Sequence, residues 1–372
     1  AGVAASLENQ PNTDTSSGHG THAAGTVAGT GAASANDPRR PAYYDGIAPE
    51  ANLIGLGAGE GLNIFFALQG FDWVLANQQR YGIDIVTNSW GSSNSVYDPN
   101  NPINRASYEA YRRGMVVTFA AGNDGPTEDT LNPYAIVPWE VNVGSGTKDK
   151  GLSDFSSRGL AGDPYKHIDV VAPGSGICST RAPGTAIGAT GPLVDATDPA
   201  YTLYYHCISG TSMATPFVAG TAALMLEVNP DLSPDQIERI LVDTANPMPG
   251  EGFQDVGGGY INVARAVEAA AMAQGERQAF LAGATAWSSQ GIWNSAAESN
   301  TRIALEGRWR AVSDATAVDG GYRQASLGKR EVPRARFAFS GTAFQLRFPR
   351  DASGGQADVY VDGVLRGRQS AS

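Results

Sequence analysis

The chain has 372 residues, of which 42% are hydrophobic and 17% are charged. This is the composition of a globular protein with a large core, and the length suits two domains. The formal net charge of -11 argues against nucleic acid or an anionic membrane surface as a partner. The sequence has no run of 18 apolar residues, so no transmembrane helix is predicted.

Two histidines stand in the first predicted helix, residues 18–29, which read GHGTHAAGTVAG. The very small residues of this helix suit close packing against a neighbouring element. His19 lies at its head, where an imidazole could act as a general base. His22, three residues later, has no third metal ligand nearby, so we expect a packed, hydrogen-bonded histidine rather than a metal site.

Residues 31–49 form a long predicted loop, which we interpret as a surface excursion. The LIGL run at residues 53–56 then predicts a buried strand, and the glycines of residues 57–61 (GAGEG) predict an open edge after it. Glycines there would let another chain approach the backbone. A GxGxG pattern also suggests phosphate binding, but no acidic ribose partner follows at the required distance.

Strands and helices alternate over the next hundred residues. We predict helices at 64–80 and 105–113 and strands at 83–87, 115–119, 141–145 and 168–172. This order indicates an α/β fold, a mostly parallel sheet with helices on both faces. Residues 88–91 (NSWG) and 120–125 (AAGNDG) follow two of these strands, at the edge where such sheets bind ligands.

The segment GTSMATP, residues 210–216, precedes an apolar run to Val228 that predicts a buried helix about 25 Å long. Thr211 is the expected N-cap, which places Ser212 in the first turn. Unpaired N–H groups and the helix dipole favour negative charge there. Pro216 fits a helix start. Taken alone, the segment leaves open whether Ser212 is a nucleophile or merely a capping residue.

Four segments, 18–29, 88–91, 120–125 and 210–225, resemble in order the motifs of the subtilisin-like serine peptidases, the subtilases. Residues 154–159 (DFSSRG) resemble a further family segment, and the resemblance covers most of residues 15–270. It implies a subtilisin-like fold and a secreted serine endopeptidase. It also implies that Ser212 is the nucleophile, His19 the general base and Asn123 the oxyanion donor.

The resemblance further implies a groove that binds a polypeptide substrate. One wall would contain Gly59 and Gly61, and the other would contain Ser89, Trp90 and Gly91. The pocket for the side chain before the scissile bond would be lined by Ala120, Ala121 and Gly122. Their small size suggests a roomy pocket without charge selection. We expect a monomer with no cofactor and no catalytic metal. Structural calcium is compatible with the family, although its ligands cannot be assigned.

The sequence departs from the family at the triad aspartate. Subtilases carry it at the end of a strand a few tens of residues before the histidine, and no such strand precedes His19. Asp14, the one aspartate upstream, is expected at the rim of the site. The sequence therefore predicts a chain shortened at its N-terminus and impaired by roughly 10⁴-fold. The alternative is an inactive subtilase-like binding or adhesive module, which the retention of His19, Asn123 and Ser212 opposes.

Cys178 and Cys207 lie in two predicted strands, 176–180 and 204–208. In the resembled fold these strands are neighbours, which implies a disulfide in an oxidising compartment. Two buried free thiols are the other interpretation. His167 and His206 show no recognisable partner in the sequence, and we expect both to be ordinary.

The last part of the chain changes character. Residues 233–236 (SPDQ) predict a capping box that opens a helix to about 245, and a last helix is predicted at 263–273. We assign 1–273 to the catalytic domain, 274–285 to a linker and 286–372 to a smaller, partial all-β sandwich of jelly-roll type. Alternating apolar residues at 336–339, 344–348 and 357–361 support the sandwich, and 359–364 resembles modules appended to secreted hydrolases.

Overall fold

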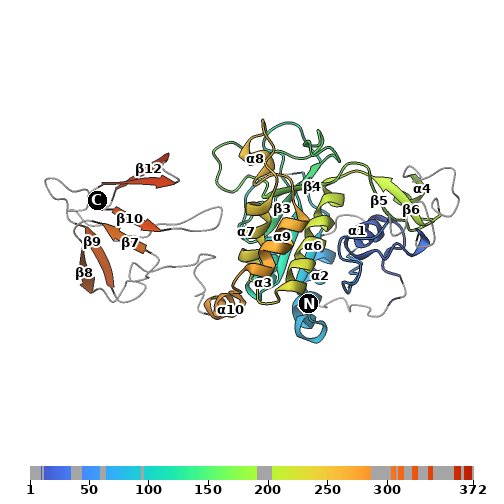
Figure 1. Cartoon of the computed structure of the whole chain (residues 1–372), viewed down its shortest axis with the longest axis horizontal. Coiled ribbons are helices and arrows are strands. Elements are labelled where there is room, and N and C mark those ends of the chain that lie inside the picture. Colours follow the sequence, from blue (N-terminus) through green and yellow to red (C-terminus); the bar gives the residue numbers. More distant parts are fainter. Residues whose placement is uncertain are drawn as a thin grey trace. The chain divides into compact units, whose positions relative to one another are not determined.

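The computed structural model describes residue 10, residues 12–34, 44–58, 64–93, 96–190 and 203–285, and six strands between 303 and 370. The chain divides into two compact units, Ala1–Ser288 and Ser289–Ser372 (Figure 1). Each unit is described by itself.

A parallel sheet of four strands forms the centre of the first unit. The strands lie side by side in chain order: β1 (Ile85–Asn88), β2 (Val116–Ala120), β3 (Val141–Gly146) and β4 (Val170–Pro173). Helix α3 (Pro102–Arg112) connects β1 to β2, and Thr118 of β2 is paired with Thr87 on one side and Val141 on the other. The predicted α/β fold with a parallel sheet is confirmed.

Both faces of the sheet are buried along β2, β3 and most of β4, whereas β1 is only partly buried. All five residues of β2 are buried, and successive side chains of a strand point to opposite faces. Val170 and Ala172 of β4 belong to a core shared with α6 (Thr211–Val228), α7 (Pro234–Thr244) and α9 (Val263–Met272). Val171, between them, belongs to a different core that contains Tyr260.

Helix α6 is the central helix of the unit. It contacts all four strands of the sheet as well as α9 and α1 (His19–Ala28). Figure 1 shows α6 beside α9, with α1 next to β5. Close approach depends on Gly220, because a Cβ atom at this position would lie only 2.7 Å from Cβ of Ile47. The loop that contains Ile47 therefore lies directly against the backbone of α6.

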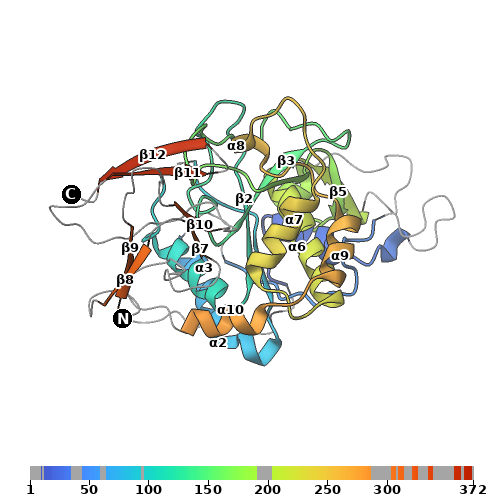
Figure 2. The ribbon, with the colours of Figure 1, turned by 60° about the vertical axis from the view of Figure 1, so that its left-hand side comes forward.

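A second group of helices contains α2 (Ile64–Tyr81), α3 and α10 (Arg277–Thr285) (Figure 2). The ring of Phe280 on α10 meets Tyr111 edge-on at 5.1 Å, and Arg277 forms an ion pair with Asp84 at 2.7 Å. The linker predicted for 274–285 is therefore largely a helix of the first unit. Its apolar residues pack against α3, which composition alone did not indicate.

The segment at residues 53–56 is not the buried strand that the sequence predicted. Leu53 is 50% exposed and Ile54 42% exposed, and no described strand pairs with them. A strand is stable only when its backbone groups find a partner. Among the described residues no strand lies beside this segment, and its apolar side chains stay at the surface.

The remaining elements of the first unit are short. They are η1 (Ala32–Ser34), β5 (Ile177–Thr180), α4 (Ala186–Thr190), β6 (Tyr205–Ile208) and α8 (Phe253–Val256). The predicted capping box is confirmed, since Ser233 and Gln236 bond each other's backbone N–H at the start of α7. No helix in the described part of the chain combines the length and apolarity needed to cross a bilayer.

The second unit contains antiparallel strand pairs. β7 (Ile303–Glu306) pairs with β10 (Arg334–Phe337), β8 (Trp309–Ser313) with β9 (Gly321–Ala325), and β11 (Gln356–Val361) with β12 (Val364–Ser370). The alternation at 357–361 thus corresponds to a strand, whereas 344–348 lies outside the described residues. The packing of these pairs into a sandwich stays a prediction.

Replacing Gly220 by alanine tests the close packing of α6. The added methyl group has no room against Ile47, so we expect Gly220→Ala to lower the free energy of unfolding by about 1–3 kcal/mol. Chemical denaturation followed by circular dichroism measures this. Gly151→Ala is the control, because its methyl group would meet only Thr147 Oγ1 at 3.4 Å. Equal stability of the two variants would contradict the packing.

Candidate active site

Asp14 fixes the start of α1, the helix that carries His19. One carboxylate oxygen of Asp14 accepts the Gly18 N–H at 2.7 Å, and the other accepts the N–H and the hydroxyl of Thr21, each at 2.8 Å. Gly18 has φ +83°, a conformation that suits glycine. These hydrogen bonds occupy Asp14 at the helix start, and within the described residues it forms none with the His19 ring.

The His19 ring is half-buried and faces a cavity. Burial lowers the pKa of His19 below its usual 6.5, and the charge of Asp14 opposes this effect only in part. Burial alone would raise the pKa of Asp14, but the hydrogen bonds from Thr21 and Gly18 outweigh it, so the net pKa of Asp14 is lowered. His19 is therefore neutral at pH 7 and able to accept a proton.

Helix α6 begins one residue earlier than the sequence predicted. Gly210 is the N-cap, and Thr211 is the first helical residue. The hydroxyl of Thr211 donates to Oδ1 of Asn123 at 3.0 Å instead of capping the helix. The predicted N-cap role of Thr211 was wrong because its partner lies 88 residues away in sequence. Ser212 nevertheless lies in the first turn, as expected.

Pro216 leaves the Ser212 carbonyl without a helical donor, because proline has no N–H to offer the residue four positions earlier. The hydroxyl of Ser89 donates to this carbonyl at 2.8 Å. In return, the hydroxyl of Ser212 donates to the Ser89 carbonyl at 3.0 Å. This reciprocal pair joins the first turn of α6 to the residue that follows β1.

The amide of Asn123 is held in one orientation by α6. Its Oδ1 accepts both the N–H and the hydroxyl of Thr211, at 2.8 and 3.0 Å. Both partners are donors, so this atom is the amide oxygen, and the amide nitrogen faces the other way. That nitrogen is 3.8 Å from the position that a Cβ on Gly210 would occupy, beside Ser212. Asn123 thus presents N–H groups to the cavity.

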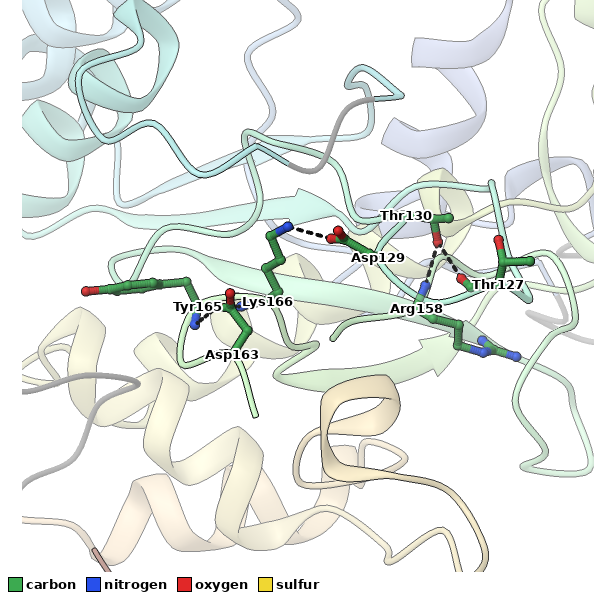
Figure 3. Close-up of polar contacts among 7 residues, drawn as sticks. All are labelled: Thr127, Asp129, Thr130, Arg158, Asp163, Tyr165 and Lys166. Carbon is green, nitrogen blue, oxygen red and sulfur yellow. Dashed lines mark hydrogen bonds and ion pairs between the residues drawn. The ribbon is translucent and has the colours of Figure 1, made fainter. Parts of the chain in front are cut away.

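Two loops support Asn123 from behind. Ser157 N–H donates to the Gly122 carbonyl at 2.9 Å, and Ser157 Oγ accepts the Asp124 N–H at 3.1 Å. Further along, Arg158 N–H donates to Thr130 Oγ1, and Lys166 forms an ion pair with Asp129 at 2.6 Å (Figure 3). The family-like segment at 154–159 therefore braces the loop that carries Asn123.

One cavity of about 540 Å³ brings three of the predicted site residues together. Its lining residues are His19, Asn123, Gly176, Ile187, Cys207, Ile208, Ser209, Gly210, Ser212 and Met213. The Ser212 hydroxyl points to the Ser89 carbonyl, and within the described residues it forms no hydrogen bond with His19. A base, a hydroxyl and an amide donor thus face the same space.

The residues predicted to form the groove walls differ in what they contact. The hydroxyl and carbonyl of Ser89 both contact Ser212. The Trp90 carbonyl accepts a hydrogen bond from Asn132 at 3.1 Å, and Gly91 lies tightly against the same side chain. Gly59 and Gly61 lie outside the described residues.

The side chains of Ala120 and Ala121 are buried, and Ala121 belongs to a core cluster. Only the backbone of these two residues can therefore line a substrate pocket. Gly122 has φ +108°, and a Cβ there would lie 2.6 Å from Ser157 Oγ. The three positions thus demand small residues for packing, independently of any ligand.

The other histidines are structural. His22 is fully buried, and its Nε2 is 3.0 Å from the Ile177 carbonyl, as expected of a packed histidine. Burial and the neighbouring His206 lower its pKa to about 4. His206 is also fully buried, with its ring 5.1 Å from that of His22. No three His, Cys, Asp or Glu side chains converge as a metal site in the described part of the chain.

His167 has a partner that the sequence analysis missed. Its Nδ1 is 3.3 Å from Asp169 Oδ1, and both side chains are buried. Burial lowers the pKa of His167, but the contact with Asp169 outweighs this, so the net pKa is raised. The signal in the sequence was the spacing, a carboxylate two residues after a histidine in the segment that leads into β4.

A disulfide joins Cys178 to Cys207, which lie opposite each other on the antiparallel strands β5 and β6. Strand β5 is also bound to α1: Ser179 donates to the His22 carbonyl at 2.9 Å and Thr180 to the Thr21 carbonyl at 2.7 Å. Strand β6 leads directly into Ser212. The disulfide-linked hairpin therefore connects the helix of His19 to the segment of Ser212.

Comparison with known proteins agrees with this geometry. The model of the subtilase family matches residues 4–278. The chain belongs to the subtilase family. Serine protease AprX of Bacillus subtilis (strain 168) is 35% identical over 268 residues, which cover 67% of this chain and 58% of AprX. Subtilisin DY of Bacillus licheniformis is 32% identical over 262 residues, which cover 69% of this chain and 80% of that protein.

The solved structure of sphericase is similar to this subtilase, with a TM-score of 0.52 and 28% identity over 67% of this chain and 79% of the other. The similarity supports the subtilisin-like arrangement of the parallel sheet and helices. The match with AprX spans 58% of that relative, and the match with alkaline serine exoprotease A of Vibrio alginolyticus spans 37% of the latter.

Replacing Asp14 by alanine should destabilise the start of α1. Loss of its hydrogen bonds to Gly18 and Thr21 is expected to cost about 1 kcal/mol near pH 7, as for other helix caps. Because the pKa of Asp14 is lowered on folding, its stabilising effect is present above the unfolded value of 3.8. The difference between wild type and variant should therefore shrink as the pH falls through the lower, folded pKa.

The same substitution should lower the pKa of His19 further, because the carboxylate that raises it is removed. Titration of the His19 ring by NMR measures this, and denaturant unfolding at several pH values measures stability. Asp14→Asn is the matched control, since it removes the charge but keeps one oxygen acceptor. An unchanged His19 pKa in both variants would contradict the electrostatic coupling.

Proposed function

We propose that this subtilase is a secreted serine endopeptidase that forms an acyl-enzyme on Ser212. The observation that carries the proposal is the cavity that His19, Asn123 and Ser212 line together, although they come from three distant segments. Membership of the family and the similarity to a serine protease and a subtilisin support it. The substrate is a polypeptide.

In the proposed mechanism, His19 removes the proton of Ser212 while the hydroxyl oxygen attacks the scissile carbonyl. The hydroxyl must first turn from the Ser89 carbonyl toward the ring, and substrate in the groove would promote this movement. A neutral His19 suits the role, since its lowered pKa keeps it ready to accept a proton. The imidazolium then gives its proton to the leaving amine.

The developing oxyanion would lie between the amide nitrogen of Asn123 and the backbone N–H of Ser212. The first-turn N–H groups of a helix have no helical acceptor, and no described protein group accepts the Ser212 N–H. Thr211 holds Asn123 in the required orientation before substrate binds. Such preorganised donors stabilise a transition state without reorganisation during the reaction.

The third member of a triad is a carboxylate that orients the histidine. No carboxylate among the described residues accepts a hydrogen bond from the His19 ring, and Asp14 acts on it only through its charge. We therefore expect slow turnover by this chain. An inactive binding module is the competing proposal; it does not account for the fixed orientation of Asn123.

Secretion and a monomeric state are parts of the same proposal. The Cys178–Cys207 disulfide supports an oxidising compartment, because both cysteines are partly exposed and accessible to reductants. No feature of the described residues points to nucleic acid as a partner, and the acidic charge opposes one.

A fluorophosphonate probe tests the proposed nucleophile, because it reacts with activated serines only. We expect the native protein to be labelled at one site, which mass spectrometry should locate at Ser212. Ser212→Ala should abolish labelling, and His19→Ala should slow it by at least about 100-fold. Heat-denatured protein is the control for unspecific reaction. Because the expected reaction is slow, labelling is followed over a long incubation, and failure of the native, folded protein to label even then would favour the binding module.

The oxyanion donors provide a second test. Asn123→Ala should reduce kcat by about 100-fold to 1,000-fold with a small change in KM, the effect known for this asparagine in subtilisin. Thr211→Val removes the hydroxyl that donates to Asn123 Oδ1 at 3.0 Å and accepts the Gly122 N–H at 3.2 Å, and it should cost about tenfold in kcat, corresponding to roughly 1.4 kcal/mol. Peptide hydrolysis measures both.

Thr221→Val is the matched control for Thr211→Val. Thr221 lies on the same helix, and its buried hydroxyl donates only to the Phe217 carbonyl. Replacing Thr221 should change the free energy of unfolding but not kcat/KM. If the Thr211 and Thr221 variants lost kcat equally, Thr211 would have no specific role in orienting Asn123.

A further inference from the structure

Two loops separate at the carboxyl end of the parallel sheet, next to the candidate active site. The pairing of β1 with β2 ends at Asn88 and Phe119. Beyond this pair, β1 continues to Trp90, whereas β2 continues to Ala120, which is paired with Val143 of β3. The hydrogen bonds of the sheet therefore do not hold Trp90 and Ala120 together.

The side chain of Asn132 bridges these two loops. Its Nδ2 donates to the Trp90 carbonyl at 3.1 Å and to the Ala120 carbonyl at 2.9 Å. Its Oδ1 accepts the N–H of Ser92 at 3.4 Å and the N–H of Tyr134 at 3.2 Å. Two carbonyls accept from one end of the amide and two N–H groups donate to the other, so its orientation is fixed and its hydrogen-bonding capacity is fully used.

Burial makes this bridge hard to replace. Asn132 is 1% exposed, and its own N–H donates to the Ala121 carbonyl at 2.8 Å. Gly91 lies so close that a Cβ atom there would be 2.2 Å from Nδ2 of Asn132. Without the amide, the carbonyls of Trp90 and Ala120 would lose a donor in a place that water does not easily reach. An unpaired polar group costs free energy there, so we expect the two loops to shift.

The same two loops also meet at the first turn of α6. Ser89 exchanges two hydrogen bonds with Ser212, and Asn123 accepts two from Thr211. The first turn of α6 is thus bound to each loop, and Asn132 binds the two loops to each other. Each of the three segments is therefore held by the other two.

We propose that Asn132 is a positioning residue for the oxyanion site: by holding the loop of Trp90 to the loop of Ala120, it sets where the amide of Asn123 lies relative to Ser212. Thr211 fixes the orientation of that amide, whereas Asn132 fixes the loop that carries it. Asn132 is not among the residues that line the cavity, so it acts through the backbone of the two loops. The inference rests on the proposed peptidase function, since it concerns how that site is built.

Two variants of Asn132 test this role. Asn132→Ala removes all four side-chain hydrogen bonds, whereas Asn132→Asp keeps the volume and the two accepted bonds but places an oxygen opposite two carbonyls. A displacement of about 1 Å can cost about 100-fold in rate, so we expect both variants to lower kcat/KM for peptide hydrolysis by about 10-fold to 100-fold. Circular dichroism and denaturant unfolding show that folded protein is assayed. Wild-type kcat/KM in the folded variants would overturn the proposal.

Asn229→Ala is the matched control. The Asn229 amide also donates to two carbonyls, those of Ala270 and Ala273, each at 2.9 Å, but at the C-terminal end of α6. Its replacement should lower the free energy of unfolding and leave kcat/KM unchanged. If Asn229→Ala lost as much kcat/KM as Asn132→Ala, Asn132 would have a general structural role only, and the proposal would be wrong.

A double-mutant cycle shows whether Asn132 acts through Asn123. If it does, Asn132→Ala should cost little kcat/KM in the background of Asn123→Ala, because the donor that it positions is already absent. Equal fold losses in the two backgrounds would show that the effect of Asn132 does not pass through Asn123 and would contradict the proposal.

A measurement without turnover separates this inference from the proposed function. In isotopically labelled full-length protein, the side-chain amide signal of Asn123, assigned by NMR with Asn123→Ala, should shift in the Asn132 variants and not in Asn229→Ala. If this shift occurs but the native protein neither reacts with the fluorophosphonate nor cleaves peptides, the proposed function fails while Asn132 still positions Asn123. If the native protein cleaves peptides and the Asn123 signal does not respond to the loss of Asn132, the function stands and this inference fails.

Discussion

The lack of a backbone N–H at Pro216 determines how the first turn of α6 is held in this protein. Pro216 cannot donate to the Ser212 carbonyl, so that carbonyl accepts the Ser89 hydroxyl at 2.8 Å, and the Ser212 hydroxyl returns a bond to the Ser89 carbonyl. The exchange fixes the first turn of α6 at the carboxyl end of β1. Because Thr211 in the same turn also holds Asn123, the position of the oxyanion donor depends on the same short segment.

The separation between His19 and Ser212 is set by packing rather than by a direct bond. Helix α1 packs against α6 and β5, and Gly25 leaves no room for a side chain against Thr180. Gly220 does the same for α6 against Ile47. Small residues therefore control how closely α1 approaches β5 and how closely the loop of Ile47 approaches α6, which explains why both motifs are rich in glycine, alanine and threonine even where no substrate reaches.

Much of the fold follows from local sequence patterns. Continuous apolar runs such as 115–119 predicted the buried parallel strands, and Ser233 with Gln236 predicted the start of α7, since these features depend on neighbours in the chain. The convergence of His19, Asn123 and Ser212 came from the family resemblance and could not have come from spacing.

The sequence could not reveal features that depend on distant partners. Residues 53–56 have the composition of a strand, but a strand also requires an adjacent backbone, and none is among the described residues. Thr211 has the residue type of a helix cap, but its hydroxyl donates to Asn123, which lies on the loop after β2 and is distant in sequence. The helix at 277–285 was hidden because its stability comes from Tyr111 and Asp84, far away in sequence. His167 and Asp169, by contrast, could have been paired from their spacing.

The disulfide has a consequence for a protein whose relatives cut polypeptides. Cys178 and Cys207 are 29 residues apart, so their bond closes a covalent ring around everything between them, including α4. Such a ring restricts the unfolded chain and stabilises the fold by about 3–4 kcal/mol. A single cleavage of the chain by another copy of the protein, between these two cysteines, would leave the two fragments joined by the disulfide. The segment that carries the nucleophile would then stay attached to the rest of the molecule.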